Sequence, residues 1–454
     1  MKKLTIGKMW QFAIGQLGWS LLSALITNWL VYIYQPDAAN VAAGQTLFIP
    51  QGLVIFGAIT IIGGITALGR IFDAVTDPWI ANLSDNSKNP GGRRIPFMRF
   101  AAVPLTIVTV LVFWSPVNGV SAVNAVWLLV MLLLFYLFMT IYCTPYNALI
   151  PELSQDQNDR INISTFISVT FLLGSAIGYA APFIWGALEP SLGRVNAQRV
   201  TFAGLSVIGL VCLLTPVFTI REKDYITAKP AGGNAFTSLK KTFSNAAFRT
   251  FVGSDVLYFV ALTIFQTGLP FFVTVLMGLP ETMTTILYVA MTLLSFACYV
   301  PVNLLGKRMG KKKLVLIGFC GLSLVYLITA LSGLFGISGL AWGIAIVFVA
   351  AFPMAILGIL PQAIVADIAQ SEAMTTGENR EGMFYAARTF AFKLGQSIAM
   401  LLFTALASIG TGGSGYRVAA VTAVVICVAG AVVLSRYNEK KVFDVIGTSA
   451  AKKN

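Results

Sequence analysis

Long apolar stretches with very few charged residues recur along this sequence. At ~1.5 Å of helix rise per residue, each stretch is long enough to cross the ~30 Å hydrocarbon core of a bilayer. Only 11% of the residues are charged, whereas a soluble domain carries roughly 25%. Because apolar residues run continuously instead of alternating with polar ones, the stretches predict helices and not barrel strands. The sequence therefore predicts an all-α membrane protein with twelve transmembrane helices, near residues 9–34, 53–83, 97–115, 123–150, 161–188, 200–220, 248–276, 283–305, 314–335, 339–369, 383–409 and 417–436.

The positive charges gather in alternate loops. Of the 31 Lys and Arg residues, 24 fall in the two tails and in every second loop, 3 in the opposite loops, and 4 within or at the edge of spans. The positive-inside rule predicts this asymmetry for cytoplasmic loops. We therefore expect both termini in the cytoplasm and the loop at 35–50 on the outer side of the plasma (cytoplasmic) membrane. The net charge of +13 then reflects topology and predicts no nucleic-acid partner.

A polar stretch at 221–247 separates two parts of the chain that share features. The segment Pro145–Glu152 has a counterpart at Pro361–Asp367, and the basic loop Lys88–Arg94 has one at Lys307–Lys313. Such repetition predicts two six-helix pseudo-repeat halves with a substrate site between them, the organisation of the major facilitator fold. The expected boundaries are 1–220 for the N-terminal half, 221–247 for a cytoplasmic linker, 248–436 for the C-terminal half and 437–454 for a cytoplasmic tail.

The second predicted span carries charged residues at membrane depth, where each is costly and needs a partner or a function. Asp73 and Asp77 are four residues apart and share a helix face. Two carboxylates this close repel each other unless a cation or proton lies between them. With the hydroxyl of Thr76, they predict a site for a monovalent cation. The structural alternative is that Arg70 neutralises one aspartate while the other packs near the cytoplasmic end.

Three groups of motifs carry a family resemblance. They are RIFDAVTDP at 70–78 with Asn82–Asp85 and GGRRIPF at 91–97; PYNALIPEL at 145–153 with Arg160; and Ala366, Asp367, Glu372, Thr376–Gly382, Phe390 and Lys393–Gly395. These motifs resemble those of the glycoside–pentoside–hexuronide:cation symporters, the melibiose permease family of the major facilitator superfamily. The resemblance implies that Asp73 and Asp77 bind the coupling Na⁺ or H⁺, that Thr140 joins the ion, and that Lys393 lies near the substrate.

The residues expected to bind the sugar differ from the melibiose-type pattern, with Ser20, Cys143, Asn147 and Ser168 at the corresponding positions. Candidate replacements are polar or aromatic side chains within spans: Gln16, Trp19, Asn147, Gln266 and Lys393. Ordinary packing or lipid contact is an equal interpretation of Trp19. Asp255, also within a span, either pairs with Arg249 or lies in the central cavity.

Arg93 and Arg94 lie in a basic loop on the predicted cytoplasmic side. One role for them is to set the topology and contact anionic lipid headgroups. The other is to pair with Asp85 and Glu381 and so form a cytoplasmic gate that closes the inner side.

Taken together, these features predict a secondary transporter that imports a sugar or glycoside-like solute with Na⁺ or H⁺ by alternating access. A non-sugar amphipathic or anionic solute is the alternative, and a membrane sensor on a transporter fold is the rival class. No enzyme is expected, because histidine and nucleophile motifs are absent, and the five cysteines lie in apolar runs. We expect no cofactor, no metal beyond a possible Na⁺, and a monomer that contacts only its small-molecule substrate and the lipid bilayer.

Overall fold

The computed structural model describes residues 4–153, 157–225, 235–376 and 380–451, and these form helices joined by loops. The chain divides into two compact units, Met1–Gly232 and Gly233–Asn454, which are described separately below as the first and second units. The division falls inside the stretch 221–247 that the sequence marks as a linker. Residues 226–234 of that stretch and residues 452–454 of the predicted tail lie outside the described residues.

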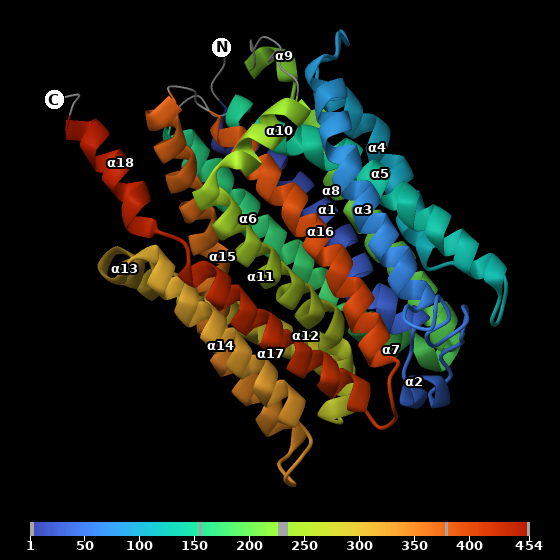
Figure 1. The fold of residues 1–454 in the computed structure, drawn as a ribbon. Coiled ribbons are helices and arrows are strands. Elements are labelled where there is room, and N and C mark those ends of the chain that lie inside the picture. Colours follow the sequence, from blue (N-terminus) through green and yellow to red (C-terminus); the bar gives the residue numbers. More distant parts are fainter. Residues whose placement is uncertain (1–3, 154–156, 226–234, 377–379, 452–454) are drawn as a thin grey trace. The chain divides into compact units, whose positions relative to one another are not determined.

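The first unit consists of α1 (Ile6–Tyr34), α2 (Ala38–Ala42), α3 (Ile61–Asp85), α4 (Ile95–Val112), α5 (Ala122–Leu153), α6 (Gln157–Tyr179), α7 (Ala181–Leu192), α8 (Arg194–Thr219) and α9 (Glu222–Tyr225). Within it, α1 packs against α6 and α8, α3 against α5, and α4 against α5 and α8. The elements can be followed along the colour gradient in Figure 1.

The second unit consists of α10 (Ala235–Ser244), α11 (Ala246–Phe271), η1 (Phe272–Leu276), α12 (Thr282–Ala297), α13 (Tyr299–Met309), α14 (Lys311–Leu331), α15 (Gly339–Thr376), α16 (Glu381–Ala407), α17 (Ser414–Ser435) and α18 (Glu439–Ala451). Here α11 packs against α16 and α17, and α14 packs against α15 and α17.

Ten segments of the described chain are long and apolar enough to cross a bilayer, and α12 with α13, bent by 42°, makes an eleventh. The one remaining predicted span, the second along the chain, corresponds to helix α3. Its 25 residues extend about 37 Å at ~1.5 Å per residue. Every eighteen-residue stretch within it contains Arg70, Asp73 and Asp77. The helix that stands out by its charge is thus the one that carries the predicted ion site.

One predicted boundary was wrong. The second span was expected to begin at residue 53, but residues 53–60 form a turn with an isolated bridge between Ile55 and Ile59. The helix begins only after Thr60, whose Oγ1 accepts the backbone N–H of Gly63 at 3.0 Å and caps the first turn. The tenth span was predicted to end near residue 369, and the helix that carries it, α15, continues to Thr376.

Candidate cation and substrate site

Three oxygen-bearing side chains meet where α3 packs against α5. The hydroxyl oxygen of Thr140 lies 2.8 Å from Oδ1 of Asp73 and 3.2 Å from Oδ1 of Asp77. Asp73 is buried, with 4% of its surface exposed, and Asp77 is half-buried. A hydroxyl has one proton, so Thr140 donates to only one carboxylate at a time. A proton on the other carboxyl, or a cation bound to both oxygens, satisfies the second contact.

Arg70 lies one helical turn before Asp73. Its Nη1 is 4.0 Å from Oδ2 of Asp73, at the limit of an ion pair. Its Nη2 donates to Oγ1 of Thr27 on α1 at 3.4 Å, and its guanidinium lies 5.1 Å from the ring centroid of Tyr136 on α5. Arg70 therefore joins three helices and balances part of the charge of Asp73, so the geometry accommodates both the structural and the ion-binding interpretation of this carboxylate.

Thr76 lies on the same helix between the two aspartates. Its hydroxyl donates to the backbone carbonyl of Phe72 at 2.9 Å, a bond that threonine commonly makes within helices. The proton of Thr76 is thereby committed to the backbone, and only the oxygen lone pairs remain for an ion. Thr140, which comes from the neighbouring helix, makes the direct contacts with the carboxylates.

The candidate substrate residues are distributed over both units. On α1, Gln16 is buried, and the ring of half-buried Trp19 lies 6.2 Å from that of Phe171 on α6. The indole N–H of Trp19 is buried and has no acceptor among the described residues. Asn147 is exposed on α5.

In the second unit, Gln266 on α11 and Lys393 on α16 are both half-buried. We predicted that these two side chains and the candidates of the first unit surround one substrate, and this stays a prediction.

Of the two interpretations of Asp255, the pair with Arg249 was wrong, and a place in the central cavity stays a prediction. Asp255 on α11 accepts two hydrogen bonds from Arg388 on α16, from Nε at 2.7 Å and from Nη2 at 3.0 Å. Both side chains are buried, and the guanidinium lies 5.5 Å from the ring centroid of Phe259. The only signal in the sequence was that both residues are ionisable within spans. Arg249 was also available, and its position in the chain did not exclude it.

At the other end of α3, the loop arginines bind acids of their own unit. Arg94 contacts Asp85 at 2.5 Å and Glu152 at 3.0 Å, and Arg93 contacts Glu152 at 3.3 Å. Burial alone would lower the pKa of Arg94, but the hydrogen bonds and charges of Glu152 and Asp85 raise it above its usual value. The predicted contact with Asp85 is thus present. Glu381 belongs to the second unit, and its contact with either arginine stays a prediction.

Glu222, which the sequence analysis did not single out, caps the start of α4. Its buried carboxylate accepts the backbone N–H groups of Arg93 at 2.8 Å, Arg94 at 2.8 Å and Ile95 at 3.1 Å. Gly92 precedes them with φ of +121°, and a Cβ there would lie 2.3 Å from Oε2 of Glu222. A side chain at position 92 would therefore collide with the capping carboxylate.

The second unit contains a matching arrangement at the start of α14. Glu439 accepts the backbone N–H groups of Lys311 at 2.8 Å and Lys312 at 3.2 Å. Gly310, with φ of +86°, precedes them. Lys311 Nζ pairs with Asp367 at 2.5 Å, as the arginines of the first unit pair with Glu152. Neither glutamate lies in the basic or proline segments that recur along the sequence, so that repetition does not identify them. The side chains of Arg160 and Lys307 and residues 377–379 lie outside the described residues.

Comparison with known proteins decides the family. Residues 11–439 match the family of MFS/sugar transport proteins. The chain belongs to this family. Over 350 residues it is 25% identical to the "putative glycoside/cation symporter YagG" of Escherichia coli (strain K12), covering 76% of this chain and 74% of that protein. Over 134 residues it is 34% identical to the "sodium-dependent lysophosphatidylcholine symporter 1" of Xenopus tropicalis, covering 29% and 24%.

Solved structures of transporters have the same fold as this chain. The crystal structure of the D-xylose-proton symporter matches 92% of this chain and 96% of that chain with a TM-score of 0.65 and 16% identity. Together with the helical spans, this confirms the predicted major facilitator fold and an integral membrane protein.

Proposed function

We propose that this chain is a symporter that carries a sugar or glycoside-like solute across the plasma membrane together with Na⁺ or H⁺. The observation that carries the proposal is the convergence of Asp73, Asp77 and Thr140, which gathers oxygen ligands at membrane depth. The likeness to the putative glycoside/cation symporter of Escherichia coli, over three quarters of the chain, supports cation coupling. The family of sugar transport proteins supports a small-molecule solute.

In this proposal the coupling cation binds the carboxylates of Asp73 and Asp77 and the hydroxyl of Thr140. The cation relieves the repulsion between the two carboxylates and stabilises the conformation that binds the solute. A ligand shifts such an equilibrium only through its different affinity for the two states. Each charge that moves inward through the membrane potential contributes ~2.3 kcal/mol per 100 mV, and this would drive accumulation of the solute.

The solute site is proposed around Gln16, Trp19 and Asn147 of the first unit, with Gln266 and Lys393 of the second. The indole of Trp19 offers an apolar face for a sugar ring and an N–H that lacks an acceptor among the described residues. Lys393 would bind an anionic group of the solute, such as a uronate. The same proposal places both termini in the cytoplasm. It also includes a cytoplasmic gate, in which Glu381 meets Arg93, Arg94 and Asp85.

An amphipathic solute is the second candidate. The Xenopus lysophosphatidylcholine symporter has a higher identity to this chain, 34%, than the Escherichia coli relative, although over a shorter segment. A lysophospholipid has both a phosphate for Lys393 and an acyl chain for apolar surfaces. Because that relative is described as sodium-dependent, Na⁺ is the coupling ion to test first.

Uptake into proteoliposomes tests both candidates. Radiolabelled glycosides, uronides and lysophosphatidylcholine are offered with a Na⁺ or a proton gradient imposed separately. We expect one solute class to accumulate with one gradient, and Asp73→Asn to abolish accumulation while leaving part of the downhill exchange. The matched control is Asp37→Asn, because Asp37 caps the short helix α2 and asparagine caps a helix equally well. Wild-type accumulation by folded Asp73→Asn protein would rule out this carboxylate as the coupling site.

A further inference from the structure

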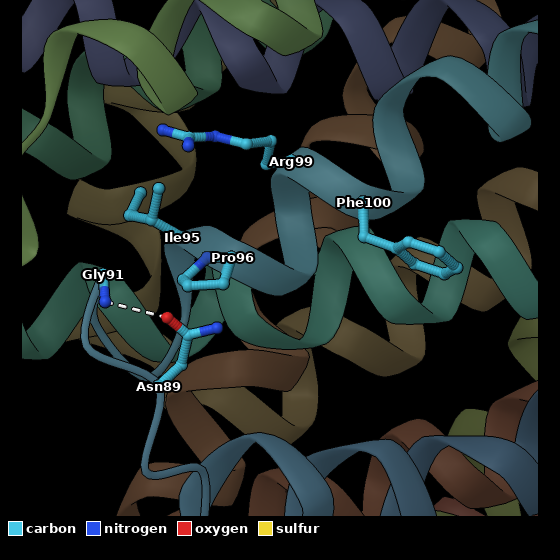
Figure 2. Close-up of a pocket in the computed structure, with 6 residues that line it drawn as sticks. All are labelled: Asn89, Gly91, Ile95, Pro96, Arg99 and Phe100. Carbon is cyan, nitrogen blue, oxygen red and sulfur yellow. Dashed lines mark hydrogen bonds between the residues drawn. The ribbon is translucent and has the colours of Figure 1, made fainter.

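A pocket with a volume of about 280 Å³ opens beside the start of α4, away from the ion site. It is lined by Asn89, Gly91, Ile95, Pro96, Arg99 and Phe100. Figure 2 shows Arg99 and Phe100 extending from α4 in opposite directions, with the loop that carries Asn89 and Gly91 next to Ile95 and Pro96. Arg99 is four residues into α4, about 6 Å along the axis, at the end that the charge bias predicts to be cytoplasmic.

Arg99 differs from the other arginines of this loop in its contacts. Arg93 and Arg94 are held by carboxylates of their own unit, and the headgroup role expected for them is therefore the weaker of their two predicted roles. Arg99 is exposed, and no ion pair with a carboxylate is present for it among the described residues. Its guanidinium lies 5.7 Å from the ring centroid of Phe218 on α8. Stacking on a ring leaves the N–H edge of the guanidinium available for a phosphate.

Asn89 provides a second donor at the pocket. Its Oδ1 accepts the backbone N–H of Gly91 at 2.8 Å, which fixes the orientation of the amide. The amide nitrogen lies on the opposite side from Gly91 in Figure 2. The –NH₂ group donates to no acceptor in the described part of the chain. Two donors, one of them cationic, therefore line a pocket that is otherwise apolar.

An apolar stripe leads from the pocket along α4 toward the middle of the membrane. Phe100, Val103 and Ile107 follow one another at helical spacing, with 64%, 44% and 52% of their surfaces exposed. Side chains three or four residues apart lie on one face of a helix, and exposed apolar side chains on a membrane helix face acyl chains. A charged head site and an apolar stripe match the two chemical parts of an amphipathic ligand.

We propose that this pocket binds the phosphate of an anionic phospholipid, with the acyl chain along Phe100, Val103 and Ile107. The phosphate accepts hydrogen bonds from the Arg99 guanidinium and the Asn89 amide. A lipid bound here connects the loop before α4 with the helix itself and with Phe218 of α8. The site is independent of the transported solute and of the coupling ion.

Native mass spectrometry of the purified full-length protein in a neutral detergent tests the proposal. Phosphatidylglycerol, phosphatidylcholine and inorganic phosphate are titrated separately against wild type, Arg99→Gln and Lys88→Gln. Lys88→Gln is the charge-matched control, because Lys88 is exposed in the same loop but does not line the pocket. We expect wild type and Lys88→Gln to bind one phosphatidylglycerol that Arg99→Gln binds about fivefold more weakly, from ~1 kcal/mol per basic residue.

A further variant separates a lipid from a free phosphate. Phe100→Ser keeps both donors and removes apolar contact, so it is expected to weaken phosphatidylglycerol binding as well. Equal phosphatidylglycerol affinity in wild type and Arg99→Gln would overturn the site. The lipid would be overturned as the ligand by a different result. In that result, inorganic phosphate binds in a way that depends on Arg99 but not on Phe100, and phosphatidylglycerol binds no more tightly than inorganic phosphate. If Arg99→Gln does not fold, Asn89→Ala and Phe100→Ser give the same decision.

Discussion

The carboxylate of Glu222 accepts the backbone N–H of Arg94 at 2.8 Å, and that of Glu439 accepts the backbone N–H of Lys311 at the same distance. In both cases the glutamate lies 128 residues after the residue whose backbone N–H it accepts. In both units the capped turn follows a glycine with positive φ, Gly92 or Gly310. A carboxylate at a helix N-terminus satisfies unpaired N–H groups and is favoured by the helix dipole. The two units thus begin their corresponding helices α4 and α14 by the same means.

Removing this cap is expected to destabilise the protein. In Glu222→Ala, three backbone N–H groups lose a charged acceptor, and a hydrogen bond to a charged group contributes ~1.5–3 kcal/mol. The expected fall in Tm is on the order of 5 °C, from ~2–4 °C per kcal/mol. The measurement is thermal unfolding in detergent, with Lys223→Ala as the neighbouring control, since Lys223 is exposed. An unchanged Tm in Glu222→Ala would contradict the capping role.

Gly92→Ala is expected to lower Tm as well, for two reasons. Alanine is strained at φ of +121°, and its Cβ would lie 2.3 Å from the Glu222 carboxylate. Because the collision disappears without Glu222, the double variant Gly92→Ala with Glu222→Ala should lose less than the sum of the two single losses. Strictly additive losses of Tm would show that the two positions do not interact.

Thr140 is expected to affect coupling through its hydroxyl alone. Thr140→Ala removes the oxygen that contacts both carboxylates, and losing one hydrogen bond to a charged group costs ~1.5–3 kcal/mol. We expect the cation concentration for half-maximal uptake to rise roughly tenfold to a hundredfold. Thr140→Ser keeps the hydroxyl and is expected to retain near wild-type cation dependence. Equal cation dependence in the alanine and serine variants would exclude the hydroxyl as an ion ligand.

Breaking the pair between Asp255 and Arg388 is expected to be among the most harmful changes in the second unit. Asp255→Asn leaves a buried guanidinium without its charged partner, and such a loss costs ~3–5 kcal/mol. The double variant Asp255→Asn with Arg388→Gln removes both charges and should recover part of the folded yield. Yield and Tm of detergent-extracted protein are the measurements. No recovery in the double variant would indicate a function of the individual charges beyond their pairing.

The predicted topology can be tested with single cysteines in a variant that lacks the five native ones. Ala43→Cys, in the exposed turn after α2, should react with a membrane-impermeant maleimide in intact cells. Ser87→Cys, in the basic loop between α3 and α4, should react only after the membrane is opened. Labelling of Ser87→Cys in intact cells would reverse the assignment of cytoplasmic sides.

The sequence by itself determined the fold to a large extent. Hydropathy is a local property of each stretch, and a bilayer permits few structures other than helices for such stretches. The apolar residues around Arg70, Asp73 and Asp77 were enough to predict α3 as a span, although these three charges make it the least apolar of the predicted spans. The four-residue spacing placed Asp73 and Asp77 on one face. The start of α3 was missed because the turn at 53–60 is itself rich in apolar residues, and hydropathy does not distinguish a turn from a helix end.

Only the tertiary structure decided which groups are partners. Asp255 and Arg388 are 133 residues apart, and Thr140 is 67 residues from Asp73. The sequence shows that an ionisable group in a span needs a partner, but the packing of α11 on α16 selects Arg388 over Arg249. Similarly, only the tertiary structure shows that Glu222 caps α4. Capping requires the carboxylate oxygens to lie about 3 Å from the backbone N–H groups and in line with them. Periodicity and charge act locally along the chain, whereas pairing depends on how the helices pack.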